Sequence, residues 1–221
     1  DHQFFTWAQY VFRKKLCTVD QGLNFHLISS KYVIAKKESL YVAFMDLSQA
    51  FDCVIIDKLW EILYSIGLDA CLVNFLRQLH ASTTACITID TQRRTSLEIK
   101  INRGVRQGCI MAPFLFNVYT NILEAYLLNL KVDSPRVGSN FIPLLLYADD
   151  AVLLSRTPFG LQKLIVGYTE SMFTLGLSIN TSKSHTMVLS RFISRKNYYF
   201  YSNNKRLLPV NSFSYLGILF D

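Results

Sequence analysis

An apolar stretch near the middle of the chain carries two adjacent carboxylates, and this pair limits how the segment can fold. Residues 143–155 read PLLLYADDAVLLS, in which Asp149 and Asp150 are the charged residues. An ionised carboxylate that is buried without a partner is costly, because it loses its hydration. The flanking runs "FIPLLLY" and "AVLLS" each have the length and composition of a short buried strand. We therefore predict a tight hairpin with Ala148, Asp149 and Asp150 at its turn.

The composition indicates a folded protein with a basic surface. Of the 221 residues, 51% are hydrophobic and 18% are charged, a balance typical of chains with a core and not of disordered ones. Basic residues gather in two stretches, five within 91–108 against Glu98 and six within 181–221 against Asp221. These stretches are compatible with two solvated faces, or with a groove that follows the phosphates of a nucleic acid. The net charge of +7 favours a polyanionic partner.

The five cysteines are scattered and contain no C-x-x-C pair, which favours a reducing, intracellular compartment over a disulfide framework or a zinc site. The most apolar stretch, 141–154, is too short for a membrane span and carries the Asp pair near its centre, so we expect no membrane partner. The chain starts at Asp1 without a methionine, and we expect it to be cut from a longer polypeptide.

The order of apolar patterns predicts an α+β fold. Strands are expected at 39–47, 83–90, 95–102, 141–147, 151–155, 185–190, 197–201, 205–210 and 213–219, and helices at 57–67, 69–81, 112–130 and 157–177. This mixed order favours a largely antiparallel sheet covered by helices on one face, and not a doubly wound parallel sheet. Neither of the glycine-rich phosphate-binding motifs of such parallel sheets is present.

Three carboxylates could meet in this fold. Asp46 ends the predicted strand 39–47, and it would approach Asp149 and Asp150 if that strand and the hairpin are neighbours in one sheet. Three carboxylates suit Mg²⁺ or Mn²⁺, and two such ions are the usual device for in-line displacement at phosphorus. The simpler alternatives are a surface Asp-Asp turn and an Asp46 that only accepts local backbone hydrogen bonds.

Several segments together resemble the core motifs of reverse transcriptases, specifically those of non-LTR (LINE-type) retrotransposons. The segments are "FRKKLCTVD" (12–20), "YVAFMDLSQAFDCV" (41–54), "RGVRQGCIMAPFLFNVYTN" (103–121), "YADD" (147–150), "GLSINTSKSHTMVLS" (176–190) and "FSYLGILFD" (213–221). The resemblance implies the palm of a right-hand polymerase with partial fingers. It places the finger-to-palm segment at 1–40, the palm at 41–190 with a finger insertion at 68–102, and the primer-grip region at 191–221. The upstream fingers and the downstream thumb are then missing from the chain.

The resemblance also implies an activity, RNA-templated DNA synthesis with an RNA template, a DNA primer and dNTPs. Asp46, Asp149 and Asp150 correspond to the catalytic carboxylates that hold two Mg²⁺ (or Mn²⁺) ions. Phe51 corresponds to the aromatic gate beneath the incoming sugar, Gln107 and Gly108 to a loop that contacts the nucleotide, and Lys183 to a lysine near the triphosphate. The expected primer and template contacts are Arg106, Tyr147, Tyr215, Leu216 and Gly217. A retrotransposon protein is expected in the nucleus and the cytoplasm.

Some residues depart from the family pattern, and other interpretations remain. Lys15 stands where the family commonly has glycine, and Ala112 lacks the hydroxyl that would cap the following helix. Phe51 could be a core aromatic, and Lys183 an ordinary exposed lysine. An alternative of another class is a truncated or co-opted copy that is inactive and only binds nucleic acid. A viral RNA polymerase on the same palm is disfavoured, because it would be expected to have a small or polar residue near Phe51.

Overall fold

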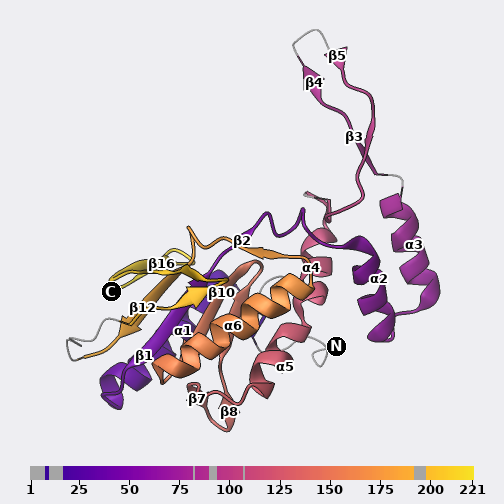
Figure 1. The fold of residues 1–221 in the computed structure, drawn as a ribbon. Coiled ribbons are helices and arrows are strands. Elements are labelled where there is room, and N and C mark those ends of the chain that lie inside the picture. The colour runs from indigo at the N-terminus through magenta and orange to yellow at the C-terminus, as the bar shows by residue number, and fades with distance from the viewer. Residues whose placement is uncertain (1–7, 10–16, 82, 90–93, 107, 192–197) are drawn as a thin grey trace. The chain divides into compact units, whose positions relative to one another are not determined.

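The computed structural model describes residues 8–9, 17–81, 83–89, 94–106, 108–191 and 198–221 (Figure 1). It divides into two compact units, one made of Asp1–Ala50 with Thr120–Asp221 and the other of Phe51–Tyr119. The predicted finger insertion, 68–102, falls inside the second unit. Most of the segment 12–20, with Lys15, lies outside the described residues.

A five-stranded sheet organises the first unit, in the order β15-β12-β1-β10-β9. All its neighbouring pairs are antiparallel except β12 with β15. The strands are β1 (Leu40–Met45), β9 (Leu144–Tyr147), β10 (Asp150–Ser155), β12 (His185–Leu189) and β15 (Leu208–Pro209). The predicted α+β class and largely antiparallel sheet are confirmed. Every residue of β1 is buried, as is typical of a central strand covered on both faces.

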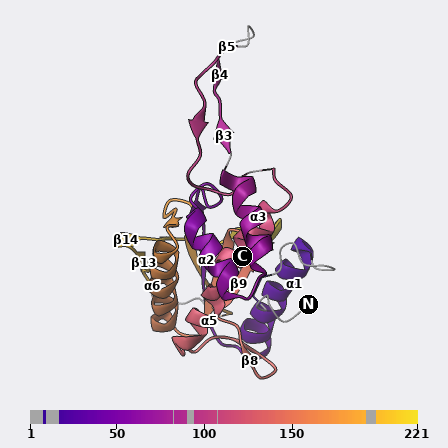
Figure 2. The same cartoon turned by 90° about the vertical axis from the view of Figure 1, so that its right-hand side faces the viewer.

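Helix α6 (Pro158–Thr174) covers one face of this sheet, and α5 (Ile122–Asn129) packs against α6. The sequence predicted helices on one face only, but the other face is also covered. It packs against α1 (Thr18–Ser29), the π-helical turn η1 (Ser30–Ala35) and a C-terminal hairpin. Figure 2 shows α6 and α1 on opposite sides of β9. Phe25 of α1 packs edge-on against Phe44 of β1, with ring centroids 5.8 Å apart.

The pattern of α1 explains why the sequence did not predict it as a helix. Its buried positions include Gln21 and Gly22, whereas Val19, Leu23 and Leu27 are exposed. The helix therefore lacks the apolar stripe on which a helix prediction rests. Gly22 packs closely on the C-terminal hairpin, because a Cβ there would lie 2.6 Å from Cδ1 of Ile218, and that side-chain end would have to shift.

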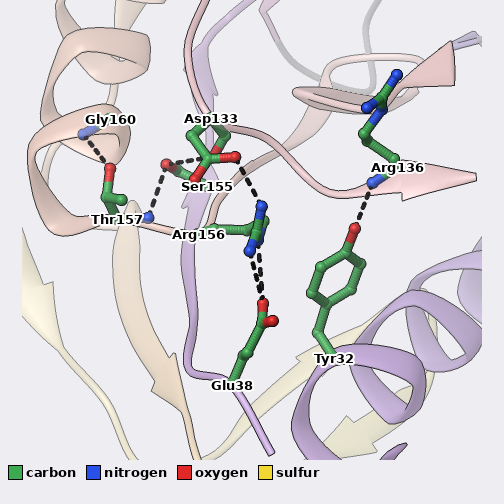
Figure 3. A network of polar contacts seen from close by, with 8 residues as sticks. All are labelled: Tyr32, Glu38, Asp133, Arg136, Ser155, Arg156, Thr157 and Gly160. Carbon is green, nitrogen blue, oxygen red and sulfur yellow. Dashed lines mark hydrogen bonds and ion pairs between the residues drawn. The ribbon is translucent and has the colours of Figure 1, made fainter. Parts of the chain in front are cut away.

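A polar network fixes the far end of β10 (Figure 3). The guanidinium of Arg156 donates to Glu38 and to Asp133, at 3.0 Å in each case. The amide of Arg156 donates to the carbonyl of Asp133 at 2.8 Å, and Ser155 donates to the same carbonyl at 3.2 Å. The network thus ties the end of β10 to the segment before β1 and to the loop that follows α5.

The second unit consists of helices and a long β-ribbon. Helices α2 (Ile56–Ser65), α3 (Ala70–Ala81) and α4 (Ala112–Thr120) flank the short strand pairs β3 (Thr84–Ala85) with β6 (Ile99–Lys100) and β4 (Thr88–Ile89) with β5 (Arg94–Thr95). Gly104 has a φ of +87°, and a Cβ there would lie 2.9 Å from the backbone of Asp52. This close approach brings the loop after β6 against the segment after Phe51.

Several predicted elements differ in the structure. The helix expected at 112–130 is interrupted at Asn121 and forms α4 and α5. The strand expected at 213–219 is a hairpin of β16 (Phe213–Tyr215) and β17 (Ile218–Phe220), because Leu216 and Gly217 turn the chain with φ angles of 49° and 82°. The strands expected at 197–201 and 205–210 are shortened to β13 (Tyr201–Ser202), β14 (Lys205–Arg206) and β15.

Two short strands, β7 (Arg136–Val137) and β8 (Asn140–Phe141), form a further hairpin before β9. None of the helices in the described part of the chain combines the length and the apolar character needed to cross a membrane.

Thr157 caps the first turn of α6, since its Oγ1 accepts from the Gly160 amide at 3.1 Å (Figure 3). Thr157→Ala leaves that amide without its acceptor and should lower the free energy of unfolding by about 1 kcal/mol. Urea denaturation measures this loss. Thr157→Ser keeps the hydroxyl and is the matched control. Equal losses in the two variants would contradict the capping role.

Candidate active site

The pairing of β1 with β10 determines where two of the three predicted carboxylates lie. Met45 is the last residue of β1 and pairs with Ala151, so the next positions, Asp46 and Asp150, come at the same end of the sheet. Because side chains alternate along strands, Asp46 follows the face of Phe44, and Asp150 follows the face of Val152. Phe44 and Val152 belong to one core cluster. Both carboxylates therefore lie beyond the end of the same apolar core.

The β9–β10 hairpin places the third carboxylate. Tyr147 pairs with Asp150, which leaves Ala148 and Asp149 as the turn between the strands. The predicted hairpin is confirmed, with Asp150 as the first residue of β10 and not part of the loop. Ala148 has a φ of 55°, a left-handed conformation that favours glycine. This tight turn holds Asp149 next to Asp150 and Asp46.

A turn at residues 180–184 clamps the backbone of Asp46 from both sides. The Asp46 amide donates to Oγ of Ser184 at 3.0 Å, and the Asp46 carbonyl accepts from the Asn180 amide at 2.9 Å. Ser184 in turn donates to the carbonyl of Asn180 at 2.8 Å. The chain leading into this turn is fixed by β11 (Ser178–Ile179), which pairs with β2 (Leu47–Ser48). These contacts fix where Asp46 lies after β1 ends.

Burial and mutual repulsion act on the carboxylates. Burial raises the pKa of Asp46; the charge of Lys183 opposes this rise, Asp149 adds to it, and a hydrogen bond from the Asn180 side chain lowers it. Burial raises the pKa of Asp150 to about 6, and the charges of Asp149 and Asp46 contribute to that rise. The charge of Asp149 thus opposes the ionisation of Asp46, and the charges of Asp149 and Asp46 oppose that of Asp150.

Two tyrosines, one on each side of the sheet, lie close to these groups. Burial raises the pKa of Tyr168 on α6, and the charges of Asp149, Asp150 and Asp46 reinforce the rise. Burial likewise raises the pKa of Tyr215 on β16, with a further contribution from Asp150. Both phenols therefore keep their protons at neutral pH.

The donors suit a hard divalent cation. Within the described residues, no three His, Cys, Asp or Glu side chains form a ready-made metal cluster. Carboxylate oxygens are nevertheless the ligands that Mg²⁺ and Mn²⁺ prefer. A cation here would also offset the burial and the mutual repulsion that raise the pKa values of Asp46 and Asp150. The residues present therefore fit such an ion.

The other predicted residues of the first unit lie around the carboxylates in different settings. Lys183 is exposed and close enough to act on the charge of Asp46. Tyr147 is half-buried at the end of β9. In the C-terminal hairpin, Gly217 is exposed and Leu216 is half-buried, whereas the Tyr215 side chain is buried, with 3% of its surface exposed.

The second unit carries the remaining predicted residues. Phe51 is half-buried and stacks on Phe116 of α4, with ring centroids 4.6 Å apart. Gly108 is exposed with a φ of +80°, and Arg106 is exposed beside it. Gln107 lies outside the described residues.

A cleft of about 510 Å³ in the second unit is lined by basic side chains from three segments. These side chains are Arg77 of α3, Lys100 of β6, and Arg103 and Arg106 of the following loop, with Asp52 and Asp57 as the acids. Part of the basic stretch 91–108 therefore faces a concave surface.

Sequence reasoning missed Asn180, Ser184 and Tyr168. Asn180 and Ser184 lie in the segment 176–190, where the sequence singled out only Lys183. An Asn followed by Ser or Thr within a short polar stretch is a known turn signal, but it does not identify which backbone the turn will clamp. Tyr168 belongs to an apolar helix face, so its proximity to the acids follows from tertiary packing alone.

The chain matches the family described as "Reverse transcriptase (RNA-dependent DNA polymerase)" over residues 1–220. It is 27% identical over 219 residues to the "Retrovirus-related Pol polyprotein from type-1 retrotransposable element R2" of Popillia japonica, covering 94% of this chain and 30% of that protein. The corresponding protein of Nasonia vitripennis is 31% identical over 183 residues, covering 80% of this chain and 17% of that protein. The chain thus spans less than a third of these relatives. They confirm the resemblance to non-LTR retrotransposon proteins.

Solved telomerase structures share the fold. Apo telomerase of Candida tropicalis truncated from its C-terminal domain superposes with a TM-score of 0.62 at 13% identity, covering 88% of this chain and 38% of that chain. Telomerase of Candida albicans in complex with a telomeric RNA fragment gives a TM-score of 0.61 at 12% identity, covering 86% and 33%. At this identity the likeness shows the fold alone, and it confirms the predicted right-hand polymerase architecture.

The raised pKa of Asp150 predicts a pH-dependent stability. An unfolded chain releases this proton near a pH of about 3.9, whereas the folded protein holds it up to about 6. Between these values the folded state binds more protons, so stability should fall as the pH rises through this window. Asp150→Asn removes the ionisation and should be more stable than the parent protein at pH 7.5, with the difference shrinking towards pH 4.5.

Urea denaturation in EDTA at both pH values measures the difference. Asp69→Asn, which removes an exposed carboxylate at the start of α3, is the charge-matched control. A stability difference for Asp150→Asn that stays constant between pH 4.5 and 7.5 would show that the carboxyl is not held protonated by its surroundings.

Proposed function

Because the chain belongs to the reverse transcriptase (RNA-dependent DNA polymerase) family, we propose that it forms the palm of a retrotransposon-encoded polymerase that copies RNA into DNA. In the proposed reaction, the 3′-hydroxyl oxygen of a DNA primer attacks the α-phosphorus of a dNTP paired to the RNA template. A new P–O bond forms, the bond to pyrophosphate breaks, and the hydroxyl proton is released.

The observation that supports this proposal most strongly is the convergence of Asp46, Asp149 and Asp150 at one end of the sheet. They come from the position after β1, from the β9–β10 turn and from the start of β10, and the charges of Asp149 and Asp46 both oppose the ionisation of Asp150. Three carboxylates at the end of apolar strands cost stability without a compensating charge. That cost is accounted for if the site binds cations when it works.

Asp46, Asp149 and Asp150 would hold two Mg²⁺ (or Mn²⁺) ions. When bound, these ions would supply the positive charge that favours the attacking alkoxide and the leaving pyrophosphate. The contribution of the chain is to hold the carboxylates in place. Asn180 and Ser184 fix the backbone of Asp46, and the hairpin fixes Asp149 and Asp150.

Lys183 extends from the turn that clamps Asp46, and it is exposed. An ammonium at this position would lie near the triphosphate of a nucleotide bound at the carboxylates, where it could neutralise charge or donate a proton to pyrophosphate. Leu216 and Gly217 at the hairpin tip, with Tyr147, are proposed to contact the primer or template.

In the second unit, Phe51 is proposed to exclude the ribose 2′-hydroxyl, and Gln107 and Gly108 to contact the nucleotide. The glycine at 108 would let the backbone approach a substrate closely. The basic cleft with Lys100, Arg103 and Arg106 offers charge for the phosphates of a template strand.

Asp149→Asn tests the proposed chemistry in the polypeptide that carries this domain. The change keeps the size of the side chain and removes its charge, so extension of a DNA primer on an RNA template should fall at least a hundredfold. Template binding, measured by fluorescence anisotropy, should change less than twofold. Asp69→Asn is the matched control and should extend normally. Extension retained by Asp149→Asn would refute the assignment.

Phe51→Val tests the proposed sugar gate. A smaller side chain should admit the 2′-hydroxyl and raise the incorporation of ribonucleotides relative to deoxynucleotides by roughly tenfold or more. Single-nucleotide extension with each substrate measures the ratio. Phe116→Leu removes the stacking partner of Phe51 and controls for disturbed packing in this unit. An unchanged ratio in Phe51→Val would assign Phe51 to the core.

A further inference from the structure

A small cavity lies directly behind the candidate active site. Its volume is about 50 Å³, and its lining comes from the end of β1, the start of β10, the clamp turn and β16. The lining residues are Phe44, Met45, Asp46, Asp150, Ala151, Lys183, Phe213 and Tyr215. One wall is apolar, because Phe44 and Phe213 stack with ring centroids 4.0 Å apart. The lining also includes the charged residues Asp46, Asp150 and Lys183 and the hydroxyl-bearing Tyr215.

Two buried oxygens on this lining have no hydrogen-bond partner within the described part of the protein. They are Oη of Tyr215 and Oδ2 of Asp46. The nearest ring neighbours of Tyr215 are Phe25 and Phe44, with centroids 5.9 Å and 6.1 Å away, and neither offers a strong acceptor. A buried polar atom without a partner costs about 1–3 kcal/mol. Such atoms usually indicate a bound water or ligand.

We propose that water in this cavity links the Tyr215 hydroxyl to the carboxylates of Asp46 and Asp150, so that Tyr215 is a positioning residue for the catalytic carboxylates. The proposal rests on the function proposed above. The cavity exceeds the about 10–15 Å³ that one water requires. It also supplies the two to four polar partners that an ordered water takes, namely the buried Tyr215, the half-buried Asp46, and the exposed Asp150 and Lys183.

The direction of the hydrogen bonds follows from the chemistry of the groups. An ionised carboxylate only accepts, so the bridging water must donate to it. The same water then accepts from the Tyr215 hydroxyl, which burial and the charge of Asp150 keep protonated. The bridge therefore directs positive partial charge towards the carboxylates and lowers the cost of their ionisation.

This arrangement divides the predicted primer-grip segment into two parts. Gly217 at the tip of the β16–β17 hairpin is exposed and available to a primer, whereas Tyr215 is buried and directed inwards. Tyr215 would act through the carboxylates and not through the primer. Its loss should therefore affect turnover and leave primer affinity unchanged.

A double-mutant cycle in EDTA, without substrate, tests the link. Tyr215→Phe removes only the hydroxyl and should lower the unfolding stability by about tenfold in the equilibrium constant, as expected for one buried hydrogen bond. In an Asp150→Asn background the same change should cost threefold or less, because the water has lost an ionised acceptor. Additive effects of the two changes would overturn the proposal.

Tyr32→Phe is the matched control for the cycle. Tyr32 is also buried, and its hydroxyl accepts from the Arg136 amide at 2.7 Å at the far end of the sheet (Figure 3). Its effect should add to that of Asp150→Asn. If both tyrosine variants couple equally to Asp150→Asn, the coupling is general and the proposal fails.

Two further measurements keep the proposal open to refutation if a variant folds poorly. A crystal structure of the unsubstituted protein should show ordered water bonded to Oη of Tyr215 and to a carboxylate oxygen; a dry cavity would overturn the link.

In primer extension, Tyr215→Phe should lower kcat several-fold and leave KM for the primer–template unchanged. A raised KM at constant kcat would make Tyr215 a primer contact. If the unsubstituted polypeptide that carries this domain extends no primer, the proposed function is contradicted. The double-mutant cycle in EDTA measures stability alone and would still test the link.

Discussion

The crowding of three carboxylates beyond one end of the β1–β10 pair is the constraint around which the site is built. The antiparallel register places Asp46 and Asp150 side by side, and a tight turn adds Asp149. Repulsion and burial oppose their ionisation, which shows in the raised pKa values of Asp46 and Asp150. The fold tolerates this cost because the strands behind the acids are packed on both faces and the backbone of Asp46 is clamped.

The two ends of β10 are held in different ways, by ion pairs at one end and by a tight turn at the other. At the far end, Arg156 ties β10 to Glu38 and Asp133. At the near end, Ala148 holds a left-handed conformation, so some strain is stored in the turn that carries Asp149. Two covered faces between these ends leave the strands little freedom to move apart. If the carboxylates act as proposed, holding them in place before the substrate arrives would meet the condition for electrostatic catalysis.

Local patterns predicted the parts of this site that depend on the sequence nearby. The apolar arms of residues 143–155 indicated the hairpin, and the acid at the end of 39–47 indicated Asp46. Helix α1 was missed because Gln21 and Gly22 occupy its buried face while Val19 and Leu23 are exposed. The roles of Asn180 and Ser184 and the burial of Tyr215 depend on contacts between segments more than 30 residues apart. No periodic pattern in the nearby sequence predicts such contacts. Motif resemblance located these segments but not the roles of their side chains.

The central claim is that the carboxylate cluster supports metal-dependent, RNA-templated DNA synthesis. The most direct measurement is extension of a DNA primer on an RNA template, with Mg²⁺ and with EDTA, by this chain and by a longer polypeptide that contains it. The account predicts extension with dNTPs that requires Mg²⁺ and stops in EDTA, at least in the longer polypeptide. Extension that persists in EDTA, or a longer polypeptide that binds the template and extends nothing in Mg²⁺, would contradict it.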